Sequence, residues 1–156
     1  QTIVFQQDKS PTPAVLPDDL HMLAIWSGEP ASTIGYVAAV HRWRQNNPIA
    51  YQFQISALRD TATQCIDALG GGNTQRVLAG IEQYDRHLER LSSISGVDFY
   101  NQTHLKMRKK VELARCTYKP SGAGGGDYGI AYSTDKEELL TLADQLKREQ
   151  KETFVL

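Results

Sequence analysis

Glycine is concentrated in one short stretch of this sequence. Five of the 12 glycines lie within residues 122–129. Consecutive glycines lose much conformational entropy on folding, so such a stretch needs a structural or functional reason. Its backbone N–H groups could converge on an anion because no Cβ blocks close approach, and the flanking Lys119 and Ser121 add a positive charge and a hydroxyl donor. A connection between two strands explains the same residues equally well, and the loop has neither the Walker A nor the dinucleotide-binding pattern.

A second candidate site is the segment from Trp26 to Thr33, which leads from an apolar run into a helical pattern. Ser32 and Thr33 place two hydroxyl groups at the expected start of that helix. The first N–H groups of a helix have no partner within the helix, and the helix dipole is positive there, so this position suits a phosphate or a carboxylate. An ordinary helix N-cap is the simpler interpretation of the same hydroxyl groups.

A basic run precedes the glycine loop and is interrupted by Glu112. On a helix, such a run most often forms a solvated face, although it could also steer a polyanionic ligand. Few aromatic residues are interleaved with it, so the pattern favours RNA binding only weakly. The run consists of Lys106, Arg108, Lys109, Lys110, Arg115 and Lys119.

The composition excludes several classes of function. With 17 basic and 18 acidic side chains, the net charge of −1 indicates no general affinity for nucleic acids or membrane surfaces, and no apolar run approaches the roughly 18 residues of a membrane span. Four scattered histidines show no metal-ligand spacing, and no acid–base pair or nucleophile stands out, so we expect neither a metal site nor a catalytic residue. Cys65 and Cys116 are expected to be buried thiols of a cytoplasmic protein, and no secretory signal is visible.

Hydrophobic periodicity predicts alternating strands and helices. Three prolines between residues 11 and 17 predict a loop after the first strand. The first helix is predicted from an apolar stripe at Ile34, Val37, Ala38 and His41, and the segment 134–137 has the form of a capping box. Strands are expected at 3–5, 21–26, 117–119, 128–132 and 154–156, and helices after Pro30 to Gln45, at 55–69, 77–91, 101–115 and 134–146.

The order of these elements favours an α+β fold in which helices pack on one face of a mainly antiparallel sheet. The length is that of one domain, residues 1–156, and it suffices for a core that needs no disulfide. We therefore expect a single domain that positions the glycine loop and the segment before the first helix.

Two of these segments together resemble motifs of a known family. The run from Ser121 to Ala131 resembles the third motif of the GHMP small-molecule kinases, and its Gly-Gly-Gly-Asp form is most similar to that of bacterial phosphomevalonate kinases. The run from Ile25 to Thr33 is similar to the Gly-Trp-Thr-Gly-x-Pro-Ala-Ser-Thr stretch of the same enzymes. The glycine motif is shared across the superfamily, whereas the second motif is narrower.

The resemblance implies a C-terminal domain with a ferredoxin-like sheet. The N-terminal domain of the family, which carries the nucleotide loop and the usual catalytic residues, has no counterpart in this chain. We therefore expect the chain to be the substrate-side half of an ATP- and Mg²⁺-dependent kinase, to need that missing domain as its partner, and to be inactive alone. The resemblance implies phosphomevalonate as the acceptor, in the isoprenoid pathway.

The resemblance also implies roles for particular residues. Ser32 and Thr33 would bind the acceptor substrate, and Lys119 is added as a substrate-binding candidate because of its charge beside the glycine loop. The glycine loop would line the cleft beside the transferred phosphate; its members are Ser121, Gly122, Ala123, Gly124, Gly125, Gly126 and Asp127.

Three alternatives stay open. The chain could belong to another GHMP enzyme, such as a mevalonate kinase, a diphosphomevalonate decarboxylase or a sugar kinase. It could be a non-catalytic ferredoxin-like module whose glycine loop binds a phosphorylated effector. RNA binding through residues 106–119 is a third possibility, and it predicts an affinity that falls steeply with salt.

Overall fold

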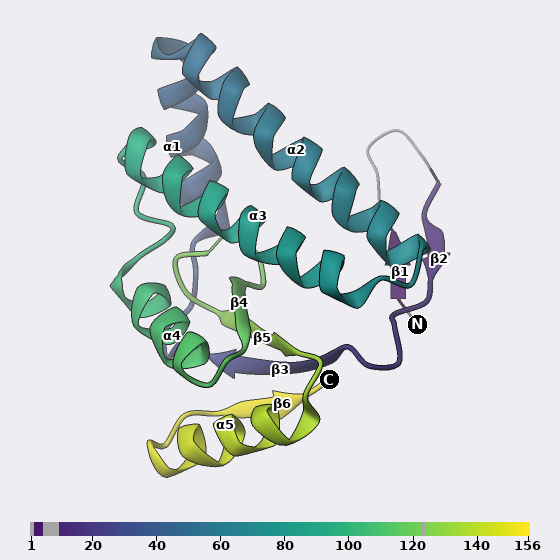
Figure 1. Ribbon diagram of the computed structural model, residues 1–156. Coiled ribbons are helices and arrows are strands. Elements are labelled where there is room, and N and C mark those ends of the chain that lie inside the picture. Colours follow the sequence, from purple (N-terminus) through teal and green to yellow (C-terminus); the bar gives the residue numbers. More distant parts are fainter. Residues whose placement is uncertain (1, 5–9, 123) are drawn as a thin grey trace.

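A four-stranded antiparallel sheet lies at the centre of the computed structural model, which describes residues 2–4, 10–122 and 124–156. Its strands are β3 (His21–Trp26), β4 (Thr117–Pro120), β5 (Tyr128–Ser133) and β6 (Thr153–Val155), in the order β4-β5-β3-β6 (Figure 1). With one helix before β4 and another before β6, this order is that of a ferredoxin-like βαββαβ unit. The predicted α+β fold class is confirmed.

Two amphipathic helices, α4 (Gln102–Leu113) and α5 (Lys136–Arg148), cover one face of the sheet. The alternation of side chains along β3 turns Leu23 and Ile25 toward these helices, where both are fully buried. The main core forms here, as predicted for helices packed on one face. From the helices it receives Met107, Val111, Leu139, Leu142, Ala143 and Leu146.

Three helices are inserted between β3 and α4: α1 (Thr33–Asn46), α2 (Pro48–Gly70) and α3 (Thr74–Ser95). The long α2 and α3 run side by side (Figure 1), and their ends match the predicted glycine signals, since Gly72 and Gly96 both adopt positive φ. The structure adds one feature to the predicted arrangement, because α3 packs against β4 on the face of the sheet opposite α4. Two neighbouring residues of β4 show this: Lys119 points toward Tyr84 of α3. Tyr118 forms a hydrogen bond with His104 of α4.

Several predicted boundaries change in the structure. Helix α2 begins at Pro48 rather than near Ile55, because Pro is favoured in the first helical turn. Asp135, not Thr134, caps α5 by accepting hydrogen bonds from the N–H groups of Glu137 and Glu138. The helix N-cap therefore lies one residue later than predicted, and the N–H of Asp135 donates to the hydroxyl of Ser133 rather than to a glutamate side chain.

The proline-rich segment contains a short strand where the sequence predicts a loop. β1 (Thr2–Val4) and β2 (Thr12–Ala14) form an antiparallel pair in which Pro13 lies opposite Ile3. Proline is tolerated there because a strand of a two-stranded sheet has one free edge that needs no N–H donor. Phe5, the end of the predicted first strand, lies outside the described residues.

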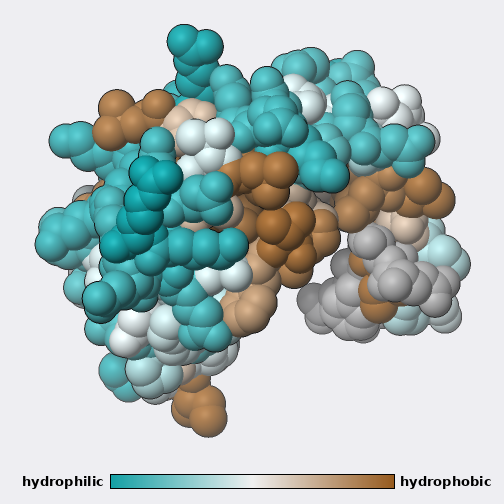
Figure 2. Space-filling model, turned by 90° about the horizontal axis from the view of Figure 1, so that it is seen from below, coloured by the Kyte–Doolittle hydropathy of each residue, from teal (hydrophilic) through white to brown (hydrophobic). Residues whose placement is uncertain are grey.

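The sequence predicts two buried thiols and no membrane-spanning segment, and the structure can be compared with both predictions. Both cysteines are free thiols; Cys116 is buried and Cys65 half-buried. Seen from below, hydrophobic residues form a central patch and several smaller groups near the edges of a largely hydrophilic face (Figure 2). At this side of the molecule β6 leaves Phe154 and Val155 exposed. None of the helices in the described ranges is both long and apolar enough to cross a membrane.

Candidate functional site

The sheet brings the two predicted site segments together. The register of β3 and β5 pairs Trp26 with Tyr128, so the segment that leaves β3 and the loop that enters β5 lie at the same end of the sheet. The glycine loop is also the connection between β4 and β5, where Pro120 pairs with Gly129. The two interpretations of the glycine stretch, strand connection and candidate anion site, are therefore compatible.

Asp127 joins the two segments. Its side-chain Oδ1 accepts a hydrogen bond of 3.1 Å from the N–H of Ala31. Its own N–H donates to the carbonyl of Glu29 at 2.8 Å, and its carbonyl accepts from the N–H of Ser27 at 2.8 Å. The residue adopts a φ of 56°, a left-handed conformation that aspartate tolerates better than most residues. Asp127 thus holds the glycine loop against the approach to α1, and this carboxylate oxygen is engaged in that contact.

Close packing explains why three positions of the loop are glycine. A Cβ on Gly124 would lie 2.2 Å from the carbonyl oxygen of Phe99, and one on Gly125 would lie 2.2 Å from the ring of Tyr36 in α1. A Cβ on Gly126 would lie 2.7 Å from the carbonyl oxygen of Glu29. These three glycines are buried, whereas Ser121 and Gly122 are exposed. Ala123 lies outside the described residues.

Ser32 and Thr33 are exposed at the start of α1, beside the loop. Ser32 occupies the N-cap position, yet its side chain makes no capping hydrogen bond. One turn further along α1, Tyr36 packs against Gly125, which fixes the helix start next to the loop. The two hydroxyl groups are therefore available to a ligand at this end of the sheet.

Lys119 is turned away from this arrangement. Its ammonium group donates to the carbonyl of Pro120 at 2.5 Å and lies 5.5 Å from the centre of the Tyr84 ring. Burial lowers the pKa of Lys119 below the usual value for lysine. The structure brings Ser32 and Thr33 to the glycine loop, but it directs the Lys119 side chain toward α3.

The first turn of α4 supplies polar contacts that the sequence analysis missed. Asn101 donates from Nδ2 to the carbonyl of Gly125 at 3.1 Å, and Nε2 of His104 lies 3.2 Å from the carbonyl oxygen of Gly126. Glu29 accepts hydrogen bonds from Asn101 and from Thr103. No spacing marks these residues, because they come together only when α4 packs beside the loop; the one available signal was Asn101 as a favourable N-cap residue.

A small apolar cavity adjoins the loop. It has a volume of about 250 Å³. Tyr36 and Phe99, which contact the loop glycines, form part of its wall, and His41 is its one histidine. The other lining residues are Val37, Val40 and Tyr51.

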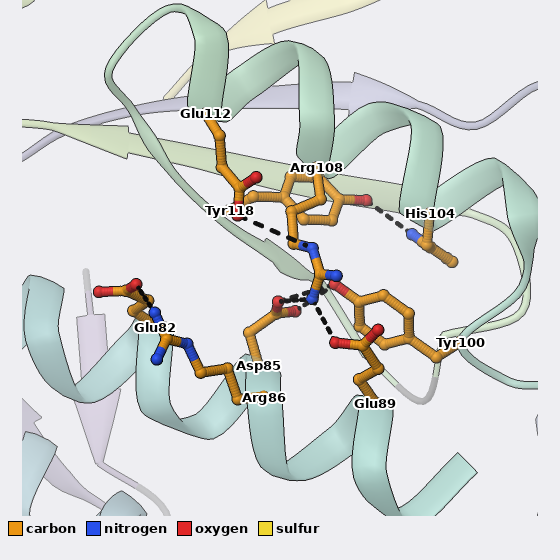
Figure 3. A network of polar contacts seen from close by, with 9 residues as sticks. All are labelled: Glu82, Asp85, Arg86, Glu89, Tyr100, His104, Arg108, Glu112 and Tyr118. Atoms are coloured by element: carbon orange, nitrogen blue, oxygen red, sulfur yellow. Dashed lines mark hydrogen bonds and ion pairs between the residues drawn. The ribbon is translucent and has the colours of Figure 1, made fainter. Parts of the chain in front are cut away.

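The basic run is largely engaged within the molecule. Arg108 donates to Glu89 at 2.6 Å and to Asp85 at 3.2 Å, both on α3 (Figure 3). Lys110 pairs with Glu149, and Arg115 lies 4.0 Å from Glu138. These pairs fit a structural role better than a nucleic-acid surface. Within the described ranges, no three His, Cys, Asp or Glu side chains are grouped so that they could hold a metal ion.

No model of a known protein family matches the chain. A comparison with individual proteins does find a relative in sequence. A phosphomevalonate kinase from Streptomyces sp. strain CL190 is 31% identical over 115 residues. The match covers 74% of this chain and 31% of that enzyme. The chain therefore corresponds to about a third of the length of this relative.

Solved structures share the fold over nearly the whole chain. A Lin0012 protein from Listeria innocua superimposes with a TM-score of 0.84 at 25% identity, over 93% of this chain and 41% of that one. L. major mevalonate kinase in complex with R-mevalonate gives 0.79 at 19% identity, over 94% and 44%. Streptococcus pneumoniae phosphomevalonate kinase in complex with phosphomevalonate and AMPPNP gives 0.74 at 23% identity, over 94% and 43%.

Proposed function

We propose, from the premise that this chain is a C-terminal domain of the GHMP kinase superfamily, that it forms the acceptor-side wall of the active site of an ATP-dependent kinase. The acceptor that we propose is phosphomevalonate, because the sequence relative at 31% identity is a phosphomevalonate kinase. Transfer of the ATP γ-phosphoryl group to the phosphate of this acceptor yields diphosphomevalonate and ADP. The free thiols and the balanced charge suit a cytoplasmic enzyme.

The observation that carries this proposal is the contact between the glycine loop and the start of α1. Asp127 ties the loop to Ala31, and the uncapped Ser32 lies next in the chain with its hydroxyl exposed. Phosphoryl transfer depends mainly on positioned donors around a spreading negative charge rather than on covalent chemistry by the protein. A loop held by Asp127 beside two hydroxyl groups meets that need on the acceptor side.

We assign the rest of the active site to a part of the enzyme outside this chain. The solved relatives are more than twice as long as the stretch that this chain covers, and one of them binds AMPPNP. ATP supplies the phosphoryl group when bound, and the loop residues Ser121 to Gly126 would face its transferred phosphate. We assign Mg²⁺ to the phosphate oxygens of ATP and to side chains of the other domain, since Mg²⁺ beside a nucleotide is usually held by phosphates and one or two carboxylates.

Mevalonate is the competing acceptor. The structural similarity to a mevalonate kinase is at least as high as the similarity to a phosphomevalonate kinase, with TM-scores of 0.79 and 0.74. In either case we expect the cavity beside Tyr36 and Phe99 to take the carbon skeleton of the acceptor, because its lining is mostly apolar.

The test is ADP release by the full-length gene product with Mg²⁺, ATP and either phosphomevalonate or mevalonate. We expect turnover with phosphomevalonate alone, and none from residues 1–156 expressed by themselves. Turnover with mevalonate alone would keep the kinase and change the acceptor. No turnover with either compound would contradict the proposal and favour a module that only binds a phosphorylated effector.

The same assay tests the two hydroxyl groups. Ser32→Ala and Thr33→Ala should raise KM for the acceptor at least several-fold more than KM for ATP, because the hydroxyl groups contact the acceptor. Ser121→Ala, on the other side of the loop, is the matched control and should act mainly on ATP. An equal effect of Ser32→Ala on both substrates, or no effect, would refute the acceptor role.

A further inference from the structure

His104 lies beneath the glycine loop and is completely buried. Its Nε2 lies 3.2 Å from the carbonyl oxygen of Gly126, and its Nδ1 lies 2.6 Å from the hydroxyl oxygen of Tyr118. A carbonyl can only accept a hydrogen bond, so Nε2 must carry the ring proton. Nδ1 is then the acceptor, and the Tyr118 hydroxyl donates to it (Figure 3).

The electrostatic surroundings favour the same protonation states. Burial lowers the pKa of His104, which keeps the imidazole neutral near pH 7. Burial also raises the pKa of Tyr118, which keeps the phenol protonated. One tautomer of His104 therefore satisfies both neighbours at once, and the other would place a lone pair of Nε2 against the Gly126 carbonyl.

A second side chain of α4 holds the preceding carbonyl of the loop. Asn101 donates to the carbonyl of Gly125 at 3.1 Å, while its own Oδ1 accepts a hydrogen bond from the N–H of His104. Two consecutive loop carbonyls, those of Gly125 and Gly126, are thus bound by residues of one helical turn. This turn fixes the orientation of both peptide groups.

The orientation has a consequence for the N–H of Gly126. In a planar trans peptide, the N–H points opposite to the carbonyl of the preceding residue. Because the Gly125 carbonyl points toward α4, the N–H of Gly126 points away from α4. Among the described residues, none accepts a hydrogen bond from this N–H. A backbone N–H of a buried residue such as Gly126 needs an acceptor, and an oxygen of a bound ligand can supply one.

We propose that His104 is a positioning residue. With its tautomer set by the Gly126 carbonyl and matched by the Tyr118 hydroxyl, and with Asn101 beside it, His104 holds the glycine loop so that the N–H of Gly126 is presented to a phosphate oxygen. The phosphate part of this inference rests on the proposed function; the positioning part does not. His104 touches no reacting atom itself and acts through the peptide of Gly126.

The first experiment measures the tautomer in residues 1–156 by long-range ¹H–¹⁵N NMR of the histidine rings. We expect His104 in the Nε2–H form at pH 7. Tyr118→Phe should keep this tautomer, because the Gly126 carbonyl still requires a donor, and should shift the ¹⁵N resonance of Nδ1, because the hydrogen bond from the Tyr118 hydroxyl is lost. The remaining three histidines serve as internal controls. A charged ring, an Nδ1–H ring in the wild type, or no response to Tyr118→Phe would overturn the inference.

The second experiment compares His104→Gln and His104→Leu in the full-length gene product. The carboxamide of Gln can still donate to the Gly126 carbonyl, so we expect kcat within about threefold of the wild type. Leu fills the space without a donor, so the Gly126 peptide is no longer held and we expect a loss of kcat of about tenfold or more. This loss lies below the factor of about 10²–10³ that follows the complete removal of a donor to the transition state. Thermal unfolding of both variants shows whether the fold is retained.

The outcomes separate the two proposals. Equal kcat for both variants would overturn the positioning role. If His104→Leu does not fold, Tyr118→Phe takes its place, with a predicted fall in kcat of several-fold at unchanged melting temperature; an unchanged kcat would then overturn the role. A wild-type gene product without kinase activity would contradict the proposed function, and the tautomer measurement would still decide whether His104 holds the loop.

Discussion

Asp85 is a carboxylate with almost no contact with solvent, 2% exposed, between α3 and α4. Both of its oxygens accept from the Tyr100 hydroxyl at 2.7 Å, and Arg108 donates to it at 3.2 Å. Burial nevertheless raises the pKa of Asp85 to about 6, against the lowering effect of Tyr100 and Arg108. Arg108 offsets only part of the effect of burial on the pKa of Asp85, because the shorter of its two hydrogen bonds goes to Glu89.

This raised pKa makes a prediction for stability. In the unfolded chain, an aspartate has a pKa of about 3.9, so between pH 4 and 6 the folded protein binds the additional proton, and stability falls as pH rises through that window. We expect the unfolding free energy of the wild type, relative to that of Asp85→Asn, to fall by on the order of 2 kcal/mol between pH 4 and pH 7.

Chemical denaturation of both proteins at several pH values gives this difference. The other carboxylates are common to both proteins, so their effects cancel. A difference that rises with pH would mean that the hydrogen bonds of Tyr100 and Arg108 outweigh the burial of Asp85.

At the scale of elements, α1 packs on a face that the sequence did not indicate. Of the predicted stripe, Ile34 is 86% exposed and Val37 is 50% exposed. The face that packs instead carries Tyr36, Val40 and Trp43, which join the core formed with α2 and α3. Each of the two faces of this helix carries enough apolar residues to be predicted as the face that packs on the core. Periodicity alone therefore could not decide which face is buried.

A substitution by serine should have different effects on stability on the two faces of α1. Ile34→Ser should change the unfolding free energy of residues 1–156 by no more than about 0.5 kcal/mol, because exposed positions contribute little. Val40→Ser should cost about 1 kcal/mol or more, because it removes half-buried methyl groups from the core. Urea denaturation compares them directly, and both variants introduce serine at a β-branched position of the same helix. A larger loss for Ile34→Ser would contradict the orientation of α1.

At the scale of the whole molecule, the core comprises three clusters of buried residues, two of which are larger than the third. One lies between the sheet and α4 and α5 and includes Leu142; the other lies among α1, α2 and α3 and includes Leu58. The ring of His104 connects them, 6.1 Å from the ring centre of Tyr100 and 6.2 Å from that of Tyr118. The ion pairs of Arg108 join α3 and α4 at the same place (Figure 3).

We therefore expect one cooperative unfolding transition. Leu142→Ala and Leu58→Ala should each cost about 2–5 kcal/mol, since each empties space in a packed core. Far-UV circular dichroism and tryptophan fluorescence should give coincident transitions in both variants. Trp43 reports on the helical part, and Trp26 reports on the sheet. Separate midpoints for the two probes would show that the parts unfold independently.

The sequence by itself determined most of the elements, the α+β class and the two segments at the candidate site. Three of these signals are local: the apolar run of β3, the stripe of apolar residues in α5, and the helix stops at Gly72 and Gly96. A local signal can be recognised from the sequence without knowledge of the contacts between distant segments. The run from Ser121 to Asp127 and the run ending in Thr33 were likewise visible as sequence motifs.

Only the tertiary structure decided which groups meet. The β3–β5 register places Asp127 beside Ala31, 96 residues away, and the packing of α4 places His104 under Gly126. It also turned Lys119 toward Tyr84 and exposed Ile34, both against expectation. Such outcomes depend on contacts between distant segments, in which burial and hydrogen-bond satisfaction choose among arrangements that are equivalent for the local chain.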